Sequence, residues 1–452
     1  MSGLYDFMYI CKIMKRVLII SYYWPPTGGS GVQRWVKFAK YLPSEGWQPV
    51  IYTPENPEQL AVDTSLERDI PKETEIIKTR ITEPYELYKK FLRKSGHSKE
   101  AVEVNPINAQ NKSFLQKTAM WVRGNFFRPD PRCMWIRPSV RFLKKYLQEH
   151  PVDLIVSTGP PQSMHMIGRK LALETGLPWI ADFRDPWTKI FYFKHLQMTK
   201  CTERWHHKME KKVLDDASVV VAVSPLVQQE FQMMTQTPVE LITNGFDECD
   251  FNADSYEPAG GGKDSDFVIA HTGLFAADGN PTMLWKVLAE KCNRDDIFRK
   301  KLKIKLVGKT DEQIIKALHD AGLKENVIDL GYQPHAVAVE EQRKASLLIL
   351  PLRKEPEYKA VLPGKLFEYL ASWRPVLGIG QPDGAMSMIL NTTKTGIVLN
   401  WEDHMSISRF IDMCWMRHLA GELTVEDADI SRFSRKELTC QMAELFNRMI
   451  EK

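Results

Sequence analysis

Two successive series of short apolar runs, alternating with helical segments, constrain the fold of this chain more than any other sequence feature. The first series opens at residues 16–21, a continuously apolar run typical of a strand buried in a parallel sheet. Residues 252–266 are polar and contain three consecutive glycines at 260–262, which indicates a linker. A second series begins at residues 267–273. The sequence therefore predicts an α/β protein with two doubly wound, Rossmann-like domains facing across a cleft.

The predicted domain bounds follow from this linker. We expect a first domain at residues 1–250, a second at 251–434, and a helix at 435–452 that packs back on the first domain. A chain of 452 residues has room for two domains of ordinary size. Residues 1–13 are expected to be a loose extension without the features of a secretory signal.

Composition narrows the class of protein. No run of eighteen or more apolar residues occurs, so no membrane-spanning helix is expected. Seven scattered cysteines without C-x-x-C spacing indicate reduced thiols and a cytoplasmic location. No cluster with metal-ligand spacing is present, so we expect no metal site and no cofactor.

A basic, aromatic segment interrupts the first domain. Residues 80–149 hold fifteen Lys and Arg against six Asp and Glu, a balance of +9 in a chain of net charge +4. Ten aromatic residues, among them Trp121 and Phe126, are distributed through the segment. Basic and aromatic residues together indicate an anionic membrane surface or a nucleic acid. A solvated face over a helical core is the simpler interpretation of any single residue.

A glycine loop follows the first strand pattern. Gly28, Gly29 and Gly31 precede a helical run that contains Gln33 and Arg34. Glycines let the backbone approach a ligand closely, and a helix N-terminus attracts anions. The spacing is not G-x-G-x-x-G, which disfavours a dinucleotide site. The alternative is that the glycines only allow a tight turn and bind no ligand.

Charged residues follow another strand pattern at residues 179–181. Asp182, Arg184 and Asp185 lie at its carboxyl end, where open α/β sheets bind their ligands. A carboxylate there can act as a base or orient a hydroxyl, and the arginine can hold a phosphate. The alternative is that these charged residues form a local network of salt bridges that only fixes the shape of the loop.

Residues 363–370 predict a helix with an anion-binding start. Lys365 lies in the first turn, where a helix ordinarily prefers an acid, and Leu366 begins its apolar stripe. Glu368, one turn further, suits a pair of ribose or sugar hydroxyls. This arrangement indicates a pocket for a nucleoside diphosphate. From these residues alone, an ordinary amphipathic helix is equally plausible.

These motifs together resemble the GT-B glycosyltransferases, specifically family 4 and its group 1 relatives in bacterial surface-polysaccharide synthesis. The resemblance spans nearly the whole chain. It rests on the glycine loop at 22–31, Ala-Val-Ser at 222–224, Ile-Thr-Asn-Gly-Phe-Asp at 242–247, His-Thr-Gly at 271–273, and the segment from Pro363 to Pro375.

The resemblance implies a metal-independent, retaining transfer of a sugar from a nucleotide-sugar to a glycan or polyprenyl-linked acceptor. The family pattern implies donor contacts for Gly29, Gly31, Lys365 and Glu368. Our further candidates for donor contacts are Gly28, Gly273, Lys309, Arg353 and Leu366. Asp182 is implied to orient the acceptor with support from Arg184 and Asp185, and acceptor contacts are implied for Gln33, Arg34 and Asn244. The basic segment fits peripheral association with the inner membrane face.

Two departures from the family pattern concern the donor site. Ala360 stands eight positions before Glu368, where the family often has a second glutamate. The arginine usual after Gly273 is absent, and Arg353 or Lys309 is the candidate replacement for its charge. A nucleotide-sugar 2-epimerase and an inactive nucleotide-sugar-binding protein therefore stay as alternatives.

Overall fold

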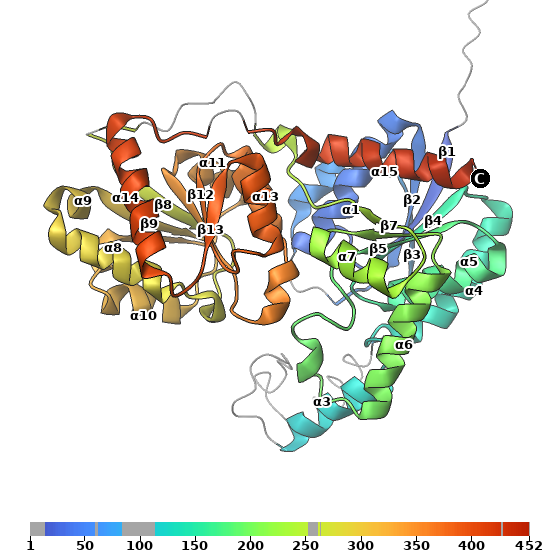
Figure 1. Cartoon of the computed structure of the whole chain (residues 1–452). Helices are drawn as coiled ribbons and strands as arrows, with labels where there is room; N and C mark the ends of the chain where they lie inside the picture. The colour runs from blue at the N-terminus through green and yellow to red at the C-terminus, as the bar shows by residue number, and fades with distance from the viewer. Residues whose placement is uncertain are drawn as a thin grey trace, which may run out of the picture. The chain divides into compact units, whose positions relative to one another are not determined.

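The computed structural model describes residues 14–58, 62–83, 114–251, 261–262, 264–425 and 428–451. Within them the chain divides into two compact units (Figure 1). The first unit takes in the chain up to Arg184, Gln197–Val220 and the residues from Thr439 on, whereas the second takes in Asp185–Leu196 and Val221–Leu438. The domain bounds at residues 250 and 434 stay a prediction.

The first of two sheets has seven strands in the order β3-β2-β1-β4-β5-β6-β7. Its inner strands are apolar on both faces, and Val17, Leu18 and Ile19 of β1 are fully buried. The strands are β1 (Lys15–Ile20), β2 (Trp47–Pro54), β3 (Glu75–Thr79), β4 (Leu154–Gly159), β5 (Trp179–Phe183), β6 (Val219–Ala222) and β7 (Val239–Leu241). The helices in this part of the chain are α1 (Ser30–Tyr41), α3 (Phe114–Phe126), α4 (Cys133–Glu149), α5 (Ser163–Thr175), α6 (Lys200–Asp216) and α7 (Pro225–Met234).

The second sheet has six strands in the order β10-β9-β8-β11-β12-β13. Its core joins Phe267 of the first strand, Trp285 of the first helix and Leu366 of α12 into one buried cluster. The strands are β8 (Phe267–Thr272), β9 (Leu302–Val307), β10 (Val327–Gly331), β11 (Leu347–Pro351), β12 (Val376–Ile379) and β13 (Gly396–Leu399). The helices are α8 (Thr282–Arg294), α9 (Asp296–Lys301), α10 (Glu312–Asp320), α11 (His335–Lys344), α12 (Gly364–Ala371), α13 (Ala385–Thr393) and α14 (His404–Ala420).

Each sheet has a point at which the chain reverses its direction of winding. In the first sheet, β1 pairs in parallel with β2 on one side and with β4 on the other. In the second sheet, β8 lies in the same way between β9 and β11. Parallel sheets bind ligands outside the carboxyl ends of strands at such points. The loops after β1, β4, β8 and β11 are therefore the places to examine for a site.

The last helix, α15 (Arg435–Ile450), carries the end of the described chain back to the first unit. The ring of Phe446 meets the ring of Trp47 on β2 edge to face, with 5.1 Å between ring centroids. The Asn447 side chain accepts a hydrogen bond of 2.9 Å from the Lys15 ammonium. These contacts tie the helix to the β1 and β2 strands.

The predicted α/β class and the two Rossmann-like sheets are confirmed. The sequence pattern did not predict strands β3, β7 and β13, because all three are short and only partly buried. Of the basic segment at 80–149, residues 84–113 lie outside the described residues, and residues 114–149 form α3, α4 and their connection. No described helix is both long and apolar enough to cross a bilayer.

Candidate functional site

The clearest site in the second unit lies where β8 ends beside the start of α12. The Lys365 ammonium donates hydrogen bonds of 3.1 Å to Nε2 of His271 and of 3.1 Å to the carbonyl oxygen of Leu274. Gly273 has a backbone φ of 84°, and a Cβ built on it would stand 3.4 Å from the Lys365 nitrogen. Absence of a side chain at Gly273 thus keeps the space in front of the ammonium open.

Burial sets the charge state of this pair. Burial, together with the neighbouring Lys365 charge, holds the pKa of His271 well below its usual value, and the side chain is only 2% exposed. The imidazole is therefore neutral and accepts the lysine hydrogen bond at Nε2. Its Nδ1 then carries the proton and has no hydrogen-bond partner among the described residues. Burial also lowers the pKa of Lys365 to about 8, against an opposing effect of Glu368.

This lowered pKa predicts a pH dependence for anion binding. Below about pH 8 the Lys365 amine is protonated and attracts an anion, whereas above it the amine is neutral. With inorganic pyrophosphate as the probe, we expect the affinity measured by calorimetry to fall as the pH rises through about 8. A K365M variant should bind weakly at every pH, and an equally steep fall in this variant would contradict the assignment.

A hydrogen-bonded chain orients Glu368. The buried Gln342 amide of α11 donates to a Glu368 carboxylate oxygen at 3.2 Å and to the Thr272 hydroxyl at 3.0 Å. The Thr272 backbone N–H in turn donates to the hydroxyl of Tyr369 at 2.8 Å. Glu368 is half-buried, and its second carboxylate oxygen accepts no hydrogen bond within the described part of the chain. This oxygen is available for a ligand hydroxyl.

Leu366 does not reach the site with its side chain. The residue is fully buried in the core of the second unit, and its N–H donates to the carbonyl of Pro363 at 3.0 Å. The expectation of a donor contact is therefore not supported for this side chain. Its role is to anchor α12 so that the preceding lysine is held in place.

The two candidate replacement cations lie at neighbouring strand ends. Arg353, after β11, forms an ion pair of 2.8 Å with Asp278, and its guanidinium lies 5.4 Å from the ring centre of Tyr358. Lys309, after β9, is exposed, and its carbonyl accepts a 2.9 Å hydrogen bond from the N–H of Phe275. Part of the Arg353 charge is thus already balanced by an acid, whereas Lys309 keeps its charge in solvent.

A second group of predicted residues meets at the β1 and β4 ends of the first unit. One guanidinium nitrogen of Arg184 donates to the Gly31 carbonyl at 2.6 Å, and the other donates to the carbonyl of Pro160. A Cβ on Gly31 would stand 2.5 Å from the first of these nitrogens. Gly29, with φ of 109°, is the exposed N-cap of α1 and leaves its first N–H groups without a side-chain cap.

Gly28 and Gln33 flank this group and are half-buried. Asp185 and Asn244 are also half-buried but are grouped with the second unit. The Asn244 side chain makes no hydrogen bond within the described residues, and Gly245 beside it passes so close to the Phe433 carbonyl that a Cβ would stand 2.2 Å from the oxygen. The contacts thus bring Lys365 and Gly273 together in the second unit, and Arg184 and Gly31 together in the first.

Asp182 and Arg34 have a different role from the predicted one. Both side chains have no exposed surface and form an ion pair of 2.8 Å. The carboxylate also accepts hydrogen bonds of 2.8 Å from the indole N–H of Trp35 and of 2.8 Å from the hydroxyl of Thr158. Burial alone would raise the pKa of Asp182, but Arg34 and these donors outweigh it and lower the pKa. Direct contact of either residue with an acceptor is therefore not supported. The pair joins α1 to β5.

Sequence reasoning missed several members of the second-unit site. From the sequence, His271 stands only within a motif, and neither Gln342 nor Thr272 has a predicted role. The available signal was a polar residue at the end of an apolar strand run, which His271 and Thr272 both provide. Within the described residues, no group of three or more His, Cys, Asp or Glu side chains has the spacing of a metal site.

Comparisons with known proteins give a family match over part of the chain and a shared fold. Residues 29–248 match the model of the family described as Glycosyltransferase Family 4. A comparison with curated proteins finds no match. Among solved structures, the chain is similar to sucrose-phosphate synthase from Thermosynechococcus elongatus, with 15% identity, a TM-score of 0.62, and coverage of 97% of this chain and 99% of that one.

Two further structures show how widely the fold is shared. A mutant of TarM from S. aureus, solved with fondaparinux, alpha-GlcNAc-glycerol and UDP, is 11% identical with a TM-score of 0.60, over 96% of this chain and 100% of that one. A putative UDP-N-acetylglucosamine 2-epimerase from Listeria monocytogenes is 9% identical with a TM-score of 0.54, over 97% of each chain. At these identities the likeness establishes the fold alone.

Proposed function

We propose that this chain is a glycosyltransferase of the family 4 type with the GT-B fold, and that it transfers a sugar from a nucleotide-sugar to a glycan or lipid-linked acceptor in bacterial surface-polysaccharide synthesis. The observation that carries the proposal is the Lys365 ammonium, held by His271 and Leu274 at the N-terminus of α12. That position suits the diphosphate of a nucleotide-sugar. The half-buried Glu368 carboxylate is oriented for the ribose hydroxyls.

The proposed reaction retains the configuration at the anomeric carbon. The bond between that carbon and the diphosphate oxygen breaks, the acceptor oxygen bonds to the carbon, and the acceptor proton passes to the departing diphosphate. Negative charge grows on the diphosphate as the bond breaks. The Lys365 ammonium and the free N–H groups of α12 stabilise that charge more in the transition state than in the bound substrate. In other enzymes a divalent cation stabilises the charge on the diphosphate. Here we assign that role to these donors, so the proposal includes no metal.

We assign the acceptor to the first unit. There Arg184 is fixed between the carbonyls of Gly31 and Pro160, next to the uncapped start of α1. Arg184 is the residue proposed to position an acceptor hydroxyl or phosphate. Asp182 acts on it indirectly, because the Arg34–Asp182 ion pair fixes the β5 strand, which ends directly before Arg184.

Peripheral membrane association is part of the proposal and rests on α3 and α4. Trp121 and Phe126 of α3 are 43% and 68% exposed, and Phe142 of α4 is also exposed. Exposed basic residues accompany them, including Arg128, Arg137, Arg141, Lys144 and Lys145. Large apolar side chains among cations are typical of a surface that binds anionic lipids.

We expect the full-length protein to float with vesicles that contain anionic lipid at low salt. A W121A/F126A double variant should lose most of this binding, because it removes two exposed rings of α3. A Y332A variant, which removes an exposed ring from the second unit, is the matched control and should float like the unchanged protein. Recovery of the unchanged protein in the soluble fraction would contradict the association.

A panel of nucleotide-sugars tests the catalytic proposal. A donor at about 100 times its Kd should stabilise the folded protein by about 2.7 kcal/mol, seen as a raised melting temperature. R353A and K309A variants then show which cation replaces the missing arginine. Only removal of that cation should weaken binding of the donor. Transfer to a lipid-linked acceptor supports the transferase. An epimerised nucleotide-sugar formed without acceptor would indicate an epimerase, and binding without any product would indicate an inactive binder.

A further inference from the structure

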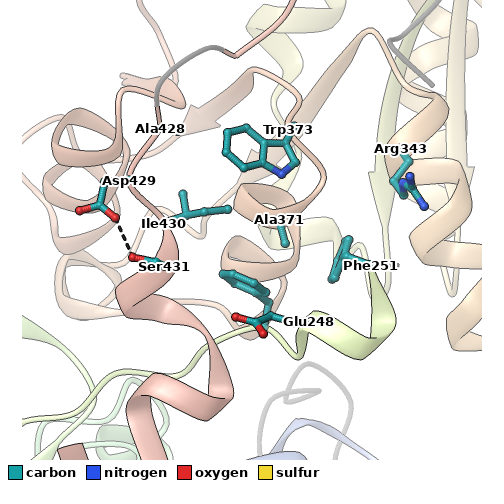
Figure 2. Close-up of a pocket in the computed structure, with 10 residues that line it drawn as sticks. Glu248, Phe251, Arg343, Ala371, Trp373, Ala428, Asp429, Ile430 and Ser431 are labelled. Atoms are coloured by element: carbon teal, nitrogen blue, oxygen red, sulfur yellow. Dashed lines mark hydrogen bonds between the residues drawn. The ribbon is translucent and has the colours of Figure 1, made fainter. Parts of the chain in front are cut away.

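A pocket in the second unit lies at the opposite end of α12 from Lys365. It has a volume of about 780 Å³ and is formed by the C-terminal ends of α11 and α12 together with two loop segments, Phe246–Phe251 and Ala428–Ser431 (Figure 2). Lys365 is the second residue of α12 and Ala371, which lines the pocket, is the last. The pocket is therefore separate from the proposed donor site, about 9 Å away along the helix axis.

Trp373 gives this pocket its most unusual feature. Its backbone has φ of 57°, the left-handed conformation just beyond the end of α12. Glycine is the usual residue at such a position, and a residue with a side chain costs about 1 kcal/mol or more there. Figure 2 shows the indole ring at one end of the pocket, with Ile430 and Asp429 on one side and Phe251 and Arg343 on the other. The unfavourable backbone thus presents a large aromatic surface to the cavity.

The remaining lining separates into an apolar floor and an acidic rim. Phe246 is buried and meets Phe251 edge to face, with 6.2 Å between ring centroids. Glu248 and Asp429 are exposed, and Asp429 accepts a 2.8 Å hydrogen bond from the Ser431 hydroxyl. The indole N–H of Trp373 has no hydrogen-bond partner within the described residues. Flat aromatic surfaces with hydrogen-bonding groups at the edge are available to a ligand.

We propose that this pocket binds a neutral saccharide. The apolar C–H face of a pyranose packs on the Trp373 indole, and the ring hydroxyls donate to the Glu248 and Asp429 carboxylates and accept from the indole N–H. Two rim carboxylates against the single guanidinium of Arg343 disfavour phosphates and other anions. Charged groups at the rim disfavour a hydrocarbon chain, because its burial would desolvate them. This inference stands independently of the proposed reaction.

Saturation-transfer NMR on the full-length protein, with neutral mono- and disaccharides as probes, tests the inference. We expect at least one saccharide to bind, and W373G to weaken it about tenfold because the ring is lost. Glycine is favoured at this φ, which offsets part of the packing that the core loses with the indole, so the variant should stay folded, as its melting temperature will show. E248Q changes only an exposed side chain and should weaken binding by several-fold, which gives a second readout that folding does not affect.

Control variants separate this pocket from other sites. W121A removes an exposed indole of the first unit, and K365M alters the proposed donor site, so both should leave saccharide binding unchanged. Adenosine and an octyl-chain detergent are included as competing probes. Absence of binding by every saccharide, binding that W373G and E248Q leave intact, or a preference for either competing probe would overturn the inference.

Discussion

Replacing Lys365 with methionine is expected to lower kcat/KM for the nucleotide-sugar by about 100- to 1,000-fold. Methionine keeps much of the side-chain length and removes the charge that would face the departing diphosphate. Loss of one preorganised donor to a developing anion typically costs this much. Most of the loss should appear in kcat, because the interaction strengthens as the charge develops. Steady-state kinetics with the donor identified in the panel measure it.

The matched control is K354M, which removes an exposed lysine paired with Glu402 in the same unit. It should leave kcat/KM within about twofold, since exposed ion pairs contribute little. Isothermal titration calorimetry with the free nucleoside diphosphate separates the effect of K365M on binding from its effect on the chemical step. If K365M retained the kinetics of the unchanged enzyme, the site at the start of α12 would not be the donor site.

Replacing Asp182 with alanine is expected to destabilise the first unit by about 3–5 kcal/mol. The change leaves the Arg34 guanidinium buried without its countercharge and removes the acceptor of the Trp35 and Thr158 hydrogen bonds. For a unit of this size, that loss lowers Tm by roughly 10 °C, which scanning calorimetry measures.

Two variants delimit this effect. D383A breaks an exposed ion pair with Lys359 and should leave Tm nearly unchanged, because exposed ion pairs contribute little. An R34M/D182L double variant removes both charges and should recover much of the stability, because apolar replacements of a buried pair are often neutral. A Tm for D182A within about 2 °C of the unchanged protein would show that Arg34 finds another partner.

Local sequence pattern was enough to predict the two sheets and the helix that carries Lys365. Residues 16–21 and 267–273 are short apolar runs followed by polar turns, so their periodicity alone indicates buried strands. Residues 363–370 predicted a helix, and α12 spans Gly364–Ala371. The proline before it and the apolar stripe within it are both local signals.

Partners distant in sequence limited the prediction of the site. Lys365 and His271 are separated by 94 positions, and Arg34 and Asp182 by 148, so neither pairing is visible in any local pattern. The strand-end position of Asp182 was predicted correctly, but its full burial follows from the packing of α1 on β5. Trp373 lies between a helix and a strand, and its positive φ could not be predicted either, because only a glycine signals that conformation in a sequence.

The return of α15 to the β1 and β2 strands has a consequence for synthesis of the protein on the ribosome. Trp47 emerges early, but Phe446, whose ring covers it, is translated only after the whole second unit. An apolar surface of the nascent first unit therefore stays exposed while the ribosome translates the second unit. Chaperones that hold such surfaces would engage the chain during this interval, and fragments truncated before α15 would aggregate more readily than the complete chain.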